Sequence, residues 1–321
     1  MYGVFEVKAR RAALVVCALV CFASAASAQS TRHESGFAEV NGARLYYESM
    51  GEGPAVVLLH GGLVDSRLWD AQMRPLSKRF RVVRYDIRGY GRSPAPAGEY
   101  SPVEDLRALL DHLKIEKATL VGLSLGGIVA ADFALEHPAR VERLVLVAAG
   151  LRGAKLPPDE AAANARRVAA SEGTGRYFEE FLKSDMLAGV RRRRPAAREA
   201  MRRMMVENYK ADAYIRAGLP QSPEPPTAQR LGQIKAPTLV VVGGLDARNA
   251  QDVAAMLAAG IPGARKVVIP GASHHPPVET PKEFNRVLLD WLGAGRRRLG
   301  TGKRRRQSLL TKADVELIAT N

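Results

Sequence analysis

Short apolar runs rich in valine and leucine alternate with amphipathic stretches along most of this chain, and this alternation is the feature that most constrains its fold. The runs are nearly continuous, as strands in a sheet covered on both faces require. They are 55–60, 81–86, 118–124, 143–149, 238–244 and 264–270, and the amphipathic stretches are 101–114, 125–137, 249–260 and 280–292. This order predicts an α/β fold with a mostly parallel central sheet and helices on both faces.

Two regions depart from this alternation. Residues 36–51 alternate between polar and apolar side chains around Asn41-Gly42, which predicts an antiparallel hairpin at the edge of the sheet. Residues 150–232 contain no strand-like run and are rich in Ala, Arg, Glu and Met. We expect them to form an all-helical cap inserted between the fourth and fifth parallel strands, which leaves 29–149 and 233–294 as the core.

Both ends of the chain are predicted to lie outside the folded core. Residues 1–28 combine basic residues, an apolar segment too short to span a bilayer, and Ala26 and Ala28 in an A-x-A arrangement, the pattern of a cleaved signal peptide. We therefore expect an exported bacterial protein, periplasmic or extracellular, with no stable membrane insertion after cleavage. Cys17 and Cys21 would leave with the signal, so the mature chain would form no disulfide. Residues 295–321 carry two basic clusters, which predicts a disordered tail.

The formal net charge of +15 is unevenly distributed. It is +2 in residues 1–28, +7 in 150–235, +6 in 295–321 and zero in the remainder. We interpret Arg191–Arg194 as a solvated run, with attraction of an anionic substrate as the alternative. We expect no nucleic-acid partner, because the chain is predicted to be exported. No metal or cofactor is expected, since neither a metal-ligand cluster nor a phosphate-binding loop is present in the sequence.

The stretch GLSLGG at 122–127 follows an apolar run and precedes an amphipathic one. A Gly-x-Ser-x-Gly pattern is weak alone, but on a sharp turn from strand to helix it presents Ser124 as a nucleophile. Gly122 and Gly126 leave room for that turn. The following helix would direct its free N–H groups and dipole at a developing oxyanion.

A serine nucleophile needs a base, and the base needs an acid that orients it. Elimination among the six histidines leaves His274 and His275, which lie in a loop after the last predicted strand. Only one of the two can be the base. Asp246 directly follows a predicted strand at the same edge of the sheet, whereas its rival Asp252 lies inside the next helix. Asp246 is therefore the favoured acid.

Five motifs together resemble the α/β-hydrolase fold superfamily, in its serine hydrolase or esterase-like form with a helical cap, over residues 36–294. They are HGGLVDSRLW (60–69), YDIRGYGRS (85–93), GLSLGG (122–127), PTLVVVGGLD (237–246) and PGASHHPPVETP (270–281). The resemblance places His274 in the catalytic position, with Ser273 replacing a glycine of the family's Gly-x-Gly-His loop. The implied triad is Ser124, Asp246 and His274.

The resemblance also assigns an oxyanion hole to the backbone N–H groups of Gly62 and Leu125, with Leu63 as the alternative to Gly62. His60, Asp86 and Arg88 are then structural. The predicted substrate-binding residues are Leu63, Met201, Met205 and Tyr209, joined by Met204 and Tyr214. Packing inside the cap is the alternative for the methionines and tyrosines of this set.

The resemblance implies a secreted serine hydrolase that cleaves a small-molecule carboxylic ester or lactone through an acyl-enzyme. Ser124 excludes the aspartate nucleophile of dehalogenases and epoxide hydrolases, and HGGLV in place of HGGPG disfavours a proline iminopeptidase. The alternatives are a carbon–carbon bond hydrolase, a cofactor-free haloperoxidase, and a ligand-binding protein that retains the hydrolase fold. The sequence determines neither the physiological substrate nor the oligomeric state.

Overall fold

The computed structural model describes residues 33–157, 160–193, 195–211 and 220–294. The predicted signal peptide and basic tail lie outside these residues, as do Tyr214 and Arg194. No helix in the described part of the chain is both long enough and apolar enough to cross a membrane.

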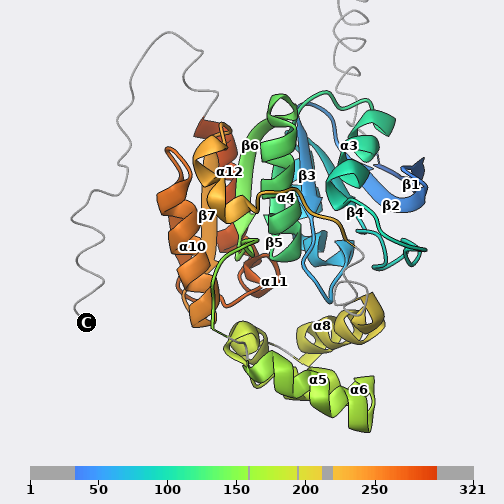
Figure 1. Ribbon diagram of the computed structural model, residues 1–321, viewed down its shortest axis with the longest axis vertical. Coiled ribbons are helices and arrows are strands. Elements are labelled where there is room, and N and C mark those ends of the chain that lie inside the picture. Colours follow the sequence, from blue (N-terminus) through green and yellow to red (C-terminus); the bar gives the residue numbers. More distant parts are fainter. Residues whose placement is uncertain (1–32, 158–159, 194, 212–219, 295–321) are drawn as a thin grey trace, which may run out of the picture.

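A single eight-stranded sheet forms the centre of the fold, in the order β1-β2-β4-β3-β5-β6-β7-β8 (Figure 1). β1, β2 and β4 are antiparallel neighbours, and all other neighbouring pairs are parallel. The predicted α/β fold with a mostly parallel sheet is therefore confirmed. The strands are β1 (His33–Val40), β2 (Ala43–Met50), β3 (Ala55–Leu59), β4 (Arg81–Tyr85), β5 (Ala118–Leu123), β6 (Val141–Val147), β7 (Thr238–Gly243) and β8 (Arg265–Ile269).

The prediction is confirmed at one edge of the sheet and wrong at the other. The hairpin of β1 and β2 is confirmed, and Asn41 and Gly42 have the positive φ angles, 49° and 70°, that a tight hairpin turn requires. The prediction that every parallel strand is buried is wrong for β8. Arg265, Lys266 and Val268 are exposed there, because β8 is the outermost strand and pairs only with β7.

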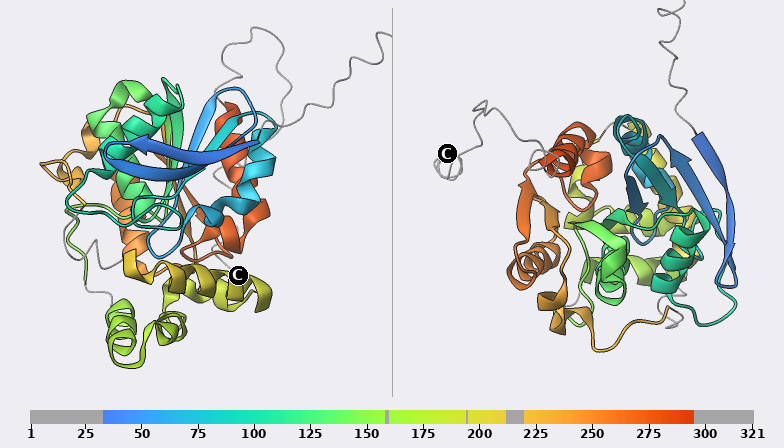
Figure 2. Two further views of the ribbon diagram at one scale, coloured as in Figure 1. Left: turned by 90° about the vertical axis from the view of Figure 1, so that its right-hand side faces the viewer. Right: turned by 90° about the horizontal axis from the view of Figure 1, so that it is seen from above.

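Helices cover both faces of the sheet (Figure 2). Successive strand residues point to opposite faces, so Val57 belongs to the same hydrophobic cluster as residues of α3, α4 and α10, while Val56 belongs to the cluster that contains residues of α2 and α12. The short α2 was not predicted, because Pro75 lies inside it. These helices are α2 (Asp70–Ser77), α3 (Pro102–His112), α4 (Leu125–Glu136), α10 (Arg248–Gly260), α11 (Pro276–Glu279) and α12 (Pro281–Ala294).

Between β6 and β7, the described residues of 160–211 form helices joined by short turns, and we call this part the helical segment. It contains α5 (Glu160–Glu172), α6 (Thr174–Phe181), the single turn η3 (Asp185–Leu187), α7 (Ala188–Arg191) and α8 (Pro195–Glu207). α8 lies closer to the sheet than α5 and α6 do (Figure 1). Apolar side chains of the segment share one hydrophobic cluster with β3, β5 and α12. Its role as a separate cap stays a prediction.

A residue before the helical segment and one after it meet on one buried carboxyl of α4. Arg152, before the segment, donates from Nε to Oδ2 of Asp132 over 3.2 Å, and the Thr227 hydroxyl, after it, donates to Oδ1. The Ala228 N–H also donates to the Arg152 carbonyl over 3.0 Å. Burial raises the pKa of Asp132 despite these two donors. The segment therefore leaves and re-enters the core at a single place.

Candidate functional site

Ser124 lies on a sharp turn between β5 and α4. Its φ of 52° and ψ of −110° are rarely adopted by a residue with a side chain, and such strain is typical of a nucleophile elbow. A Cβ added to Gly122 would lie 2.2 Å from the Gly126 carbonyl oxygen, and one added to Gly126 would lie 2.4 Å from the Leu59 carbonyl oxygen. The turn therefore requires glycine on both sides of Ser124.

The loop after β3 lies directly against this turn. A Cβ added to Gly61 would be 3.4 Å from the Cβ of Ser124. Two residues further along the same loop, Leu63 has a φ of 63°, which residues with a side chain rarely adopt. The sequence motif at 60–69 and the Ser124 turn are thus brought together.

His60 fixes the orientation of the peptide between Gly61 and Gly62. The Ile87 N–H donates to Nε2 of His60 over 2.9 Å, so in the neutral ring the proton is on Nδ1, which lies 2.7 Å from the Gly61 carbonyl and donates to it. Burial lowers the pKa of His60, which keeps the ring neutral. In a trans peptide the C=O and N–H point in opposite directions, so the Gly62 N–H is directed away from His60. A structural role for His60 follows from these contacts.

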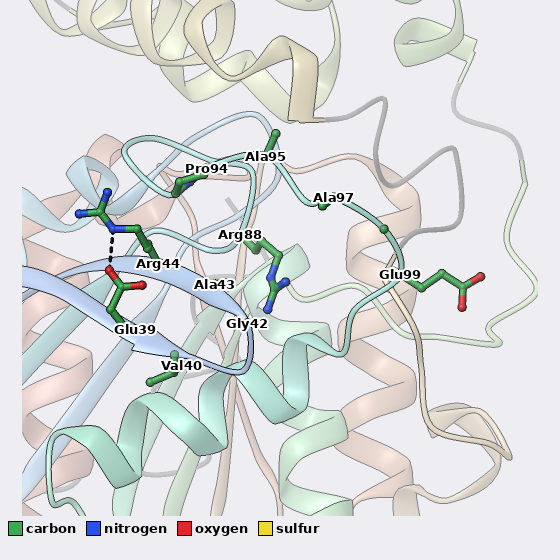
Figure 3. Close-up of a pocket in the computed structure, with 11 residues that line it drawn as sticks. Glu39, Val40, Gly42, Ala43, Arg44, Arg88, Pro94, Ala95, Ala97 and Glu99 are labelled. Carbon is green, nitrogen blue, oxygen red and sulfur yellow. Dashed lines mark hydrogen bonds and ion pairs between the residues drawn. The ribbon is translucent and has the colours of Figure 1, made fainter.

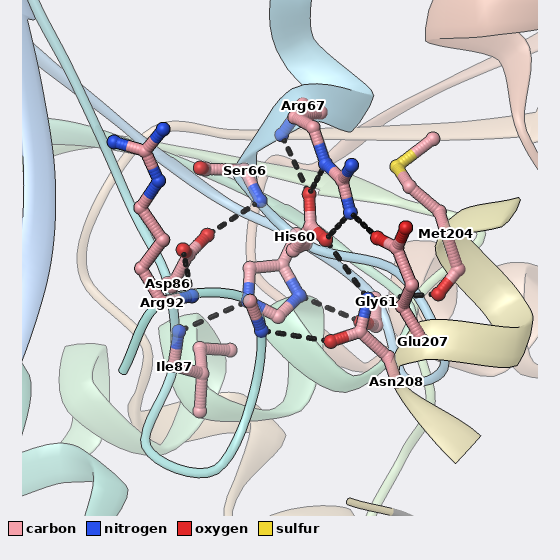
Figure 4. A network of polar contacts seen from close by, with 12 residues as sticks. His60, Gly61, Ser66, Arg67, Asp86, Ile87, Arg92, Met204, Glu207 and Asn208 are labelled. Atoms are coloured by element: carbon pink, nitrogen blue, oxygen red, sulfur yellow. Dashed lines mark hydrogen bonds and ion pairs between the residues drawn. The ribbon is translucent and has the colours of Figure 1, made fainter. Parts of the chain in front are cut away.

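Asp86 braces the same loop, as expected from the sequence. Its Oδ1 accepts from the Ser66 N–H over 2.9 Å and its Oδ2 from the Arg92 N–H over 2.8 Å (Figure 4). Arg88 acts elsewhere: it pairs with Asp105 of α3 over 2.6 Å and donates to the Asn41 carbonyl in the hairpin turn.

Asn208, at the end of α8, connects the helical segment to both loops (Figure 4). Its Nδ2 donates to Asp65 over 2.8 Å, and its Oδ1 accepts from the Gly91 N–H over 2.7 Å. Burial alone would raise the pKa of Asp65, but hydrogen bonds from Arg67 and Asn208 lower it below its usual range. Sequence reasoning missed Asn208, because a single asparagine in a helix carries no recognisable pattern.

His274 and Asp246 form a buried pair at the carboxyl edge of the sheet. Nδ1 of His274 lies 3.0 Å from Oδ2 and 3.2 Å from Oδ1 of Asp246. Since a carboxylate only accepts, Nδ1 carries the proton and Nε2 is the basic nitrogen. The rival Asp252 instead pairs with Arg248 along α10 over 2.8 Å.

The end of β7 packs on the loop that carries His274. A Cβ on Gly243 would lie 2.1 Å from the Ser273 carbonyl oxygen, and the Leu245 N–H donates to the Ala272 carbonyl over 2.9 Å. Asp246 itself donates from its backbone N–H to Gly243 over 3.2 Å and accepts from the Ala247 N–H at Oδ1. These backbone contacts set the positions of both side chains in the pair.

His275 is buried beside His274 but faces another carboxyl. Its backbone N–H donates to Oε1 of Glu279 over 3.0 Å. Burial, reinforced by His274, lowers the pKa of His275 well below its usual value. Burial disfavours the charged form of Glu279 as well, which raises the pKa of this carboxyl, although hydrogen bonds from Ser273 and His275 oppose that rise. Glu279 was not among the predicted site residues, and its spacing of four residues from His275 was the available signal.

The neutral state of His275 predicts a stability difference that depends on pH. The unfolded chain would bind a proton at His275 below about pH 6.5, whereas the folded protein would not, so the wild type loses stability as the pH falls. The gap in unfolding free energy between the wild type and His275→Ala should therefore shrink by up to about 1.4 kcal/mol per pH unit below that value. Urea unfolding followed by circular dichroism measures this gap, and a gap that is constant with pH would contradict a neutral His275.

The predicted substrate-binding residues occupy different surroundings. Met201 and Met204 line a cavity of about 500 Å³ between α8, α2 and α11, together with Val278 just beyond the two histidines. Met205 is buried in the hydrophobic cluster, and the Tyr209 ring centroid lies 4.8 Å from that of Tyr177. Neither Met205, Tyr209 nor Leu63 lines this cavity.

The arginine run and a second cavity lie apart from these residues. Arg191 donates to the carbonyls of Leu182 and Ser184, where it caps the end of α6. The second cavity, of about 570 Å³, lies at the edge hairpin and is lined by Arg44 and Arg88 (Figure 3). It contains none of the predicted site residues.

Comparisons with known proteins agree with this fold. A curated protein of Mycobacterium tuberculosis, itself uncharacterised, is 42% identical over 117 residues, which are 36% of this chain and 34% of that protein. This chain therefore matches only about a third of that relative's length. A pimeloyl-[acyl-carrier protein] methyl ester esterase of Aeromonas hydrophila is 30% identical over 77% of this chain and 98% of its own.

Two further similar proteins have names that give other substrates. A 2-hydroxy-6-oxononadienedioate/2-hydroxy-6-oxononatrienedioate hydrolase of Cupriavidus pinatubonensis is 31% identical over 78% of this chain and 91% of its own. The crystal structure of the enol-lactonase from Burkholderia xenovorans has a TM-score of 0.71 and 31% identity, covering 80% of this chain and all of that one. A family model described as alpha/beta hydrolase family matches residues 56–287, so this chain belongs to the alpha/beta hydrolase family.

Proposed function

We propose that this protein is a serine hydrolase that cleaves a small-molecule carboxylic ester or lactone, with Ser124, His274 and Asp246 as its catalytic triad. The observation that carries the proposal is the buried pair of His274 and Asp246 at the edge of the sheet where β5 ends in the strained Ser124 turn. The two proposed substrate classes, esters and lactones, are taken from the names of similar proteins that are 30% and 31% identical to this chain.

In the proposed mechanism, Oγ of Ser124 attacks the carbonyl carbon while Nε2 of His274 takes the hydroxyl proton. Asp246 accepts from Nδ1 of His274, which fixes the ring and stabilises the imidazolium that forms. The tetrahedral intermediate expels the alcohol, which receives the proton from Nε2. Water then attacks the acyl-enzyme with His274 again as base, and the acid and the free Ser124 hydroxyl are released.

The oxyanion would be held by the backbone N–H groups of Leu125 and Gly62. Leu125 is the first residue of α4, and the first N–H groups of a helix have no partner inside it. The hydrogen bond from His60 to the Gly61 carbonyl turns the Gly62 N–H to the opposite side, as described above. Loss of one such donor typically costs about 3 kcal/mol of transition-state stabilisation.

A fluorophosphonate probe tests the proposal. It should label the wild type and Ser184→Ala, whose hydroxyl has no hydrogen-bond partner among the described residues, and should not label Ser124→Ala. If Ser124→Ala keeps the wild-type rate on p-nitrophenyl esters, the nucleophile is wrong. We also propose export through residues 1–28, so the labelled protein should be found outside the cytoplasm.

A substrate panel then separates the remaining candidates. The Cupriavidus relative favours one second candidate, hydrolysis of a carbon–carbon bond in a ring-cleavage product. Esters, lactones and such a product should be assayed side by side with the same preparation. Turnover of an ester or lactone supports the proposed activity, whereas turnover of the ring-cleavage product alone would replace it. Binding without any turnover would favour the non-enzymatic alternative.

A further inference from the structure

Ser273, which replaces a glycine of the family's loop, connects the loop of His274 to the helical segment. Its hydroxyl oxygen accepts from the Gly189 N–H of α7 over 3.0 Å and lies 3.0 Å from the carbonyl oxygen of Met186 in η3. The His274 N–H donates to the same carbonyl over 3.3 Å. We call Ser273, Glu279, Met186 and Gly189 the latch.

Glu279 completes the latch from the opposite side. It is fully buried at the end of α11, and its Oε1 lies 2.8 Å from the Ser273 hydroxyl oxygen. Its Oε2 accepts from the Ser273 N–H over 2.5 Å, and its Oε1 accepts from the His275 N–H over 3.0 Å. Gly189 packs directly on this carboxyl, since an added Cβ would lie 1.8 Å from Oε2.

A count of protons assigns the state of this carboxyl. The Ser273 hydroxyl has one hydrogen but two contacts that would need it, to the Met186 carbonyl and to Oε1 of Glu279. A carbonyl oxygen can only accept, so both contacts are hydrogen bonds only when the hydroxyl hydrogen points to Met186 and the second contact has a hydrogen of its own. The 2.8 Å contact then requires a hydrogen on Oε1, and 2.8 Å is an ordinary O–H···O distance.

We propose that Glu279 is a neutral carboxylic acid whose proton, donated to Ser273, fastens the His274 loop to the helical segment. Burial, which raises the pKa of Glu279, favours the same state. His275, whose Nδ1 lies 4.0 Å from Oε1, and His274 are titratable groups that face it. From α2, the neutral Gln72 donates to the Pro277 carbonyl, and Asp70 lines the cavity beside Pro277 and Val278. Met186 and Gly189, the latch residues of the helical segment, have no ionisable side chain.

Ionisation of Glu279 would loosen the latch. The Ser273 hydroxyl would then turn its only hydrogen to the carboxylate, which leaves its oxygen facing the Met186 carbonyl oxygen at 3.0 Å without a hydrogen between them. Two acceptors at that distance repel each other. The latch therefore holds below the pKa of folded Glu279 and weakens as the pH rises through it. Glu279 and Ser273 are thus positioning residues for His274, a role that rests on the proposed function.

Carbon-13 NMR of glutamate-labelled protein tests the protonation state without any assay of activity. The carboxyl carbon of Glu279, assigned from its absence in Glu279→Gln, should titrate above the usual glutamate value of about 4.3. Titration at or below that value would overturn the proposal. This result stands whether or not Ser124 is a nucleophile.

The rate of fluorophosphonate labelling tests the positioning role. Ser273→Ala should be labelled about tenfold more slowly than the wild type at a pH below the measured Glu279 titration. The ratio of the wild-type labelling rate to the Ser273→Ala rate should approach one at a pH above the Glu279 titration, because the wild-type latch is then already open. Ser184→Ala, a buried serine of the helical segment outside the latch, should match the wild type at every pH. A ratio that does not change with pH would overturn the proposal. A purely structural effect of removing the Ser273 hydroxyl would not depend on the protonation state of Glu279. Absence of labelling in the wild type would instead reject the proposed function and leave the NMR titration to decide the latch.

Discussion

Replacing His274 by alanine should lower kcat for ester hydrolysis by roughly 10⁴-fold or more, whereas replacing His275 should leave kcat within about tenfold of the wild type. The two residues are adjacent and both are buried, so the pair is its own control for general damage to the loop. Only His274 has a ring nitrogen that contacts Asp246, which lies 3.0 Å from its Nδ1. Without that base the Ser124 hydroxyl would have to attack with its proton still attached.

The His275 variant serves as a control only if its loop stays folded. The contact between residue 275 and Glu279 uses the backbone N–H, which alanine keeps. Circular dichroism and urea unfolding of both variants would verify the fold before the kinetic comparison. If His275→Ala loses activity and His274→Ala keeps it, the two roles are exchanged and the pairing with Asp246 is not catalytic.

The sequence predicted the residues that follow the strands, because those positions depend on local pattern and on one rule of topology. Ser124 and Asp246 each follow an apolar run, and the carboxyl ends of parallel strands meet at one edge of the sheet. The choice of His274 over His275 needed the resemblance as well, since both lie in the same loop. The structure then supplied a physical difference, because only one of the two rings faces Asp246.

Two contacts that were missed from the sequence join distant parts of the chain. Asn208 bonds to Asp65, which is 143 positions away in the sequence, and Ser273 bonds to Gly189, which is 84 positions away. Neither contact leaves a local pattern, because each depends on where the helical segment meets the sheet. The exposure of β8 was missed for a similar reason: its apolar run predicts a strand, but only the strand order makes it an edge.

Replacing Gly126 by alanine should destabilise the protein by about 3 kcal/mol and slow the proposed reaction by roughly 100-fold or more. The new methyl group would lie 2.4 Å from the Leu59 carbonyl oxygen and 2.5 Å from that of His60. Both atoms belong to the backbone, so no side-chain rotation relieves the clash. The start of α4 must instead move away from β3, and it would take with it the Ser124 turn and the Leu125 N–H.

The matched control is Gly98→Ala, since a Cβ at Gly98 meets no atom within 4 Å and its φ is not positive. It should change the unfolding free energy by less than about 0.5 kcal/mol and leave the rate unchanged. Urea unfolding and the fluorophosphonate rate, measured on both variants, separate loss of folded protein from loss of geometry. A stable but slow Gly126→Ala protein would show that the approach of α4 to β3 determines the position of the oxyanion donor. An active variant of wild-type stability would mean that the elbow tolerates the displacement, and Leu125 would no longer be supported as a donor.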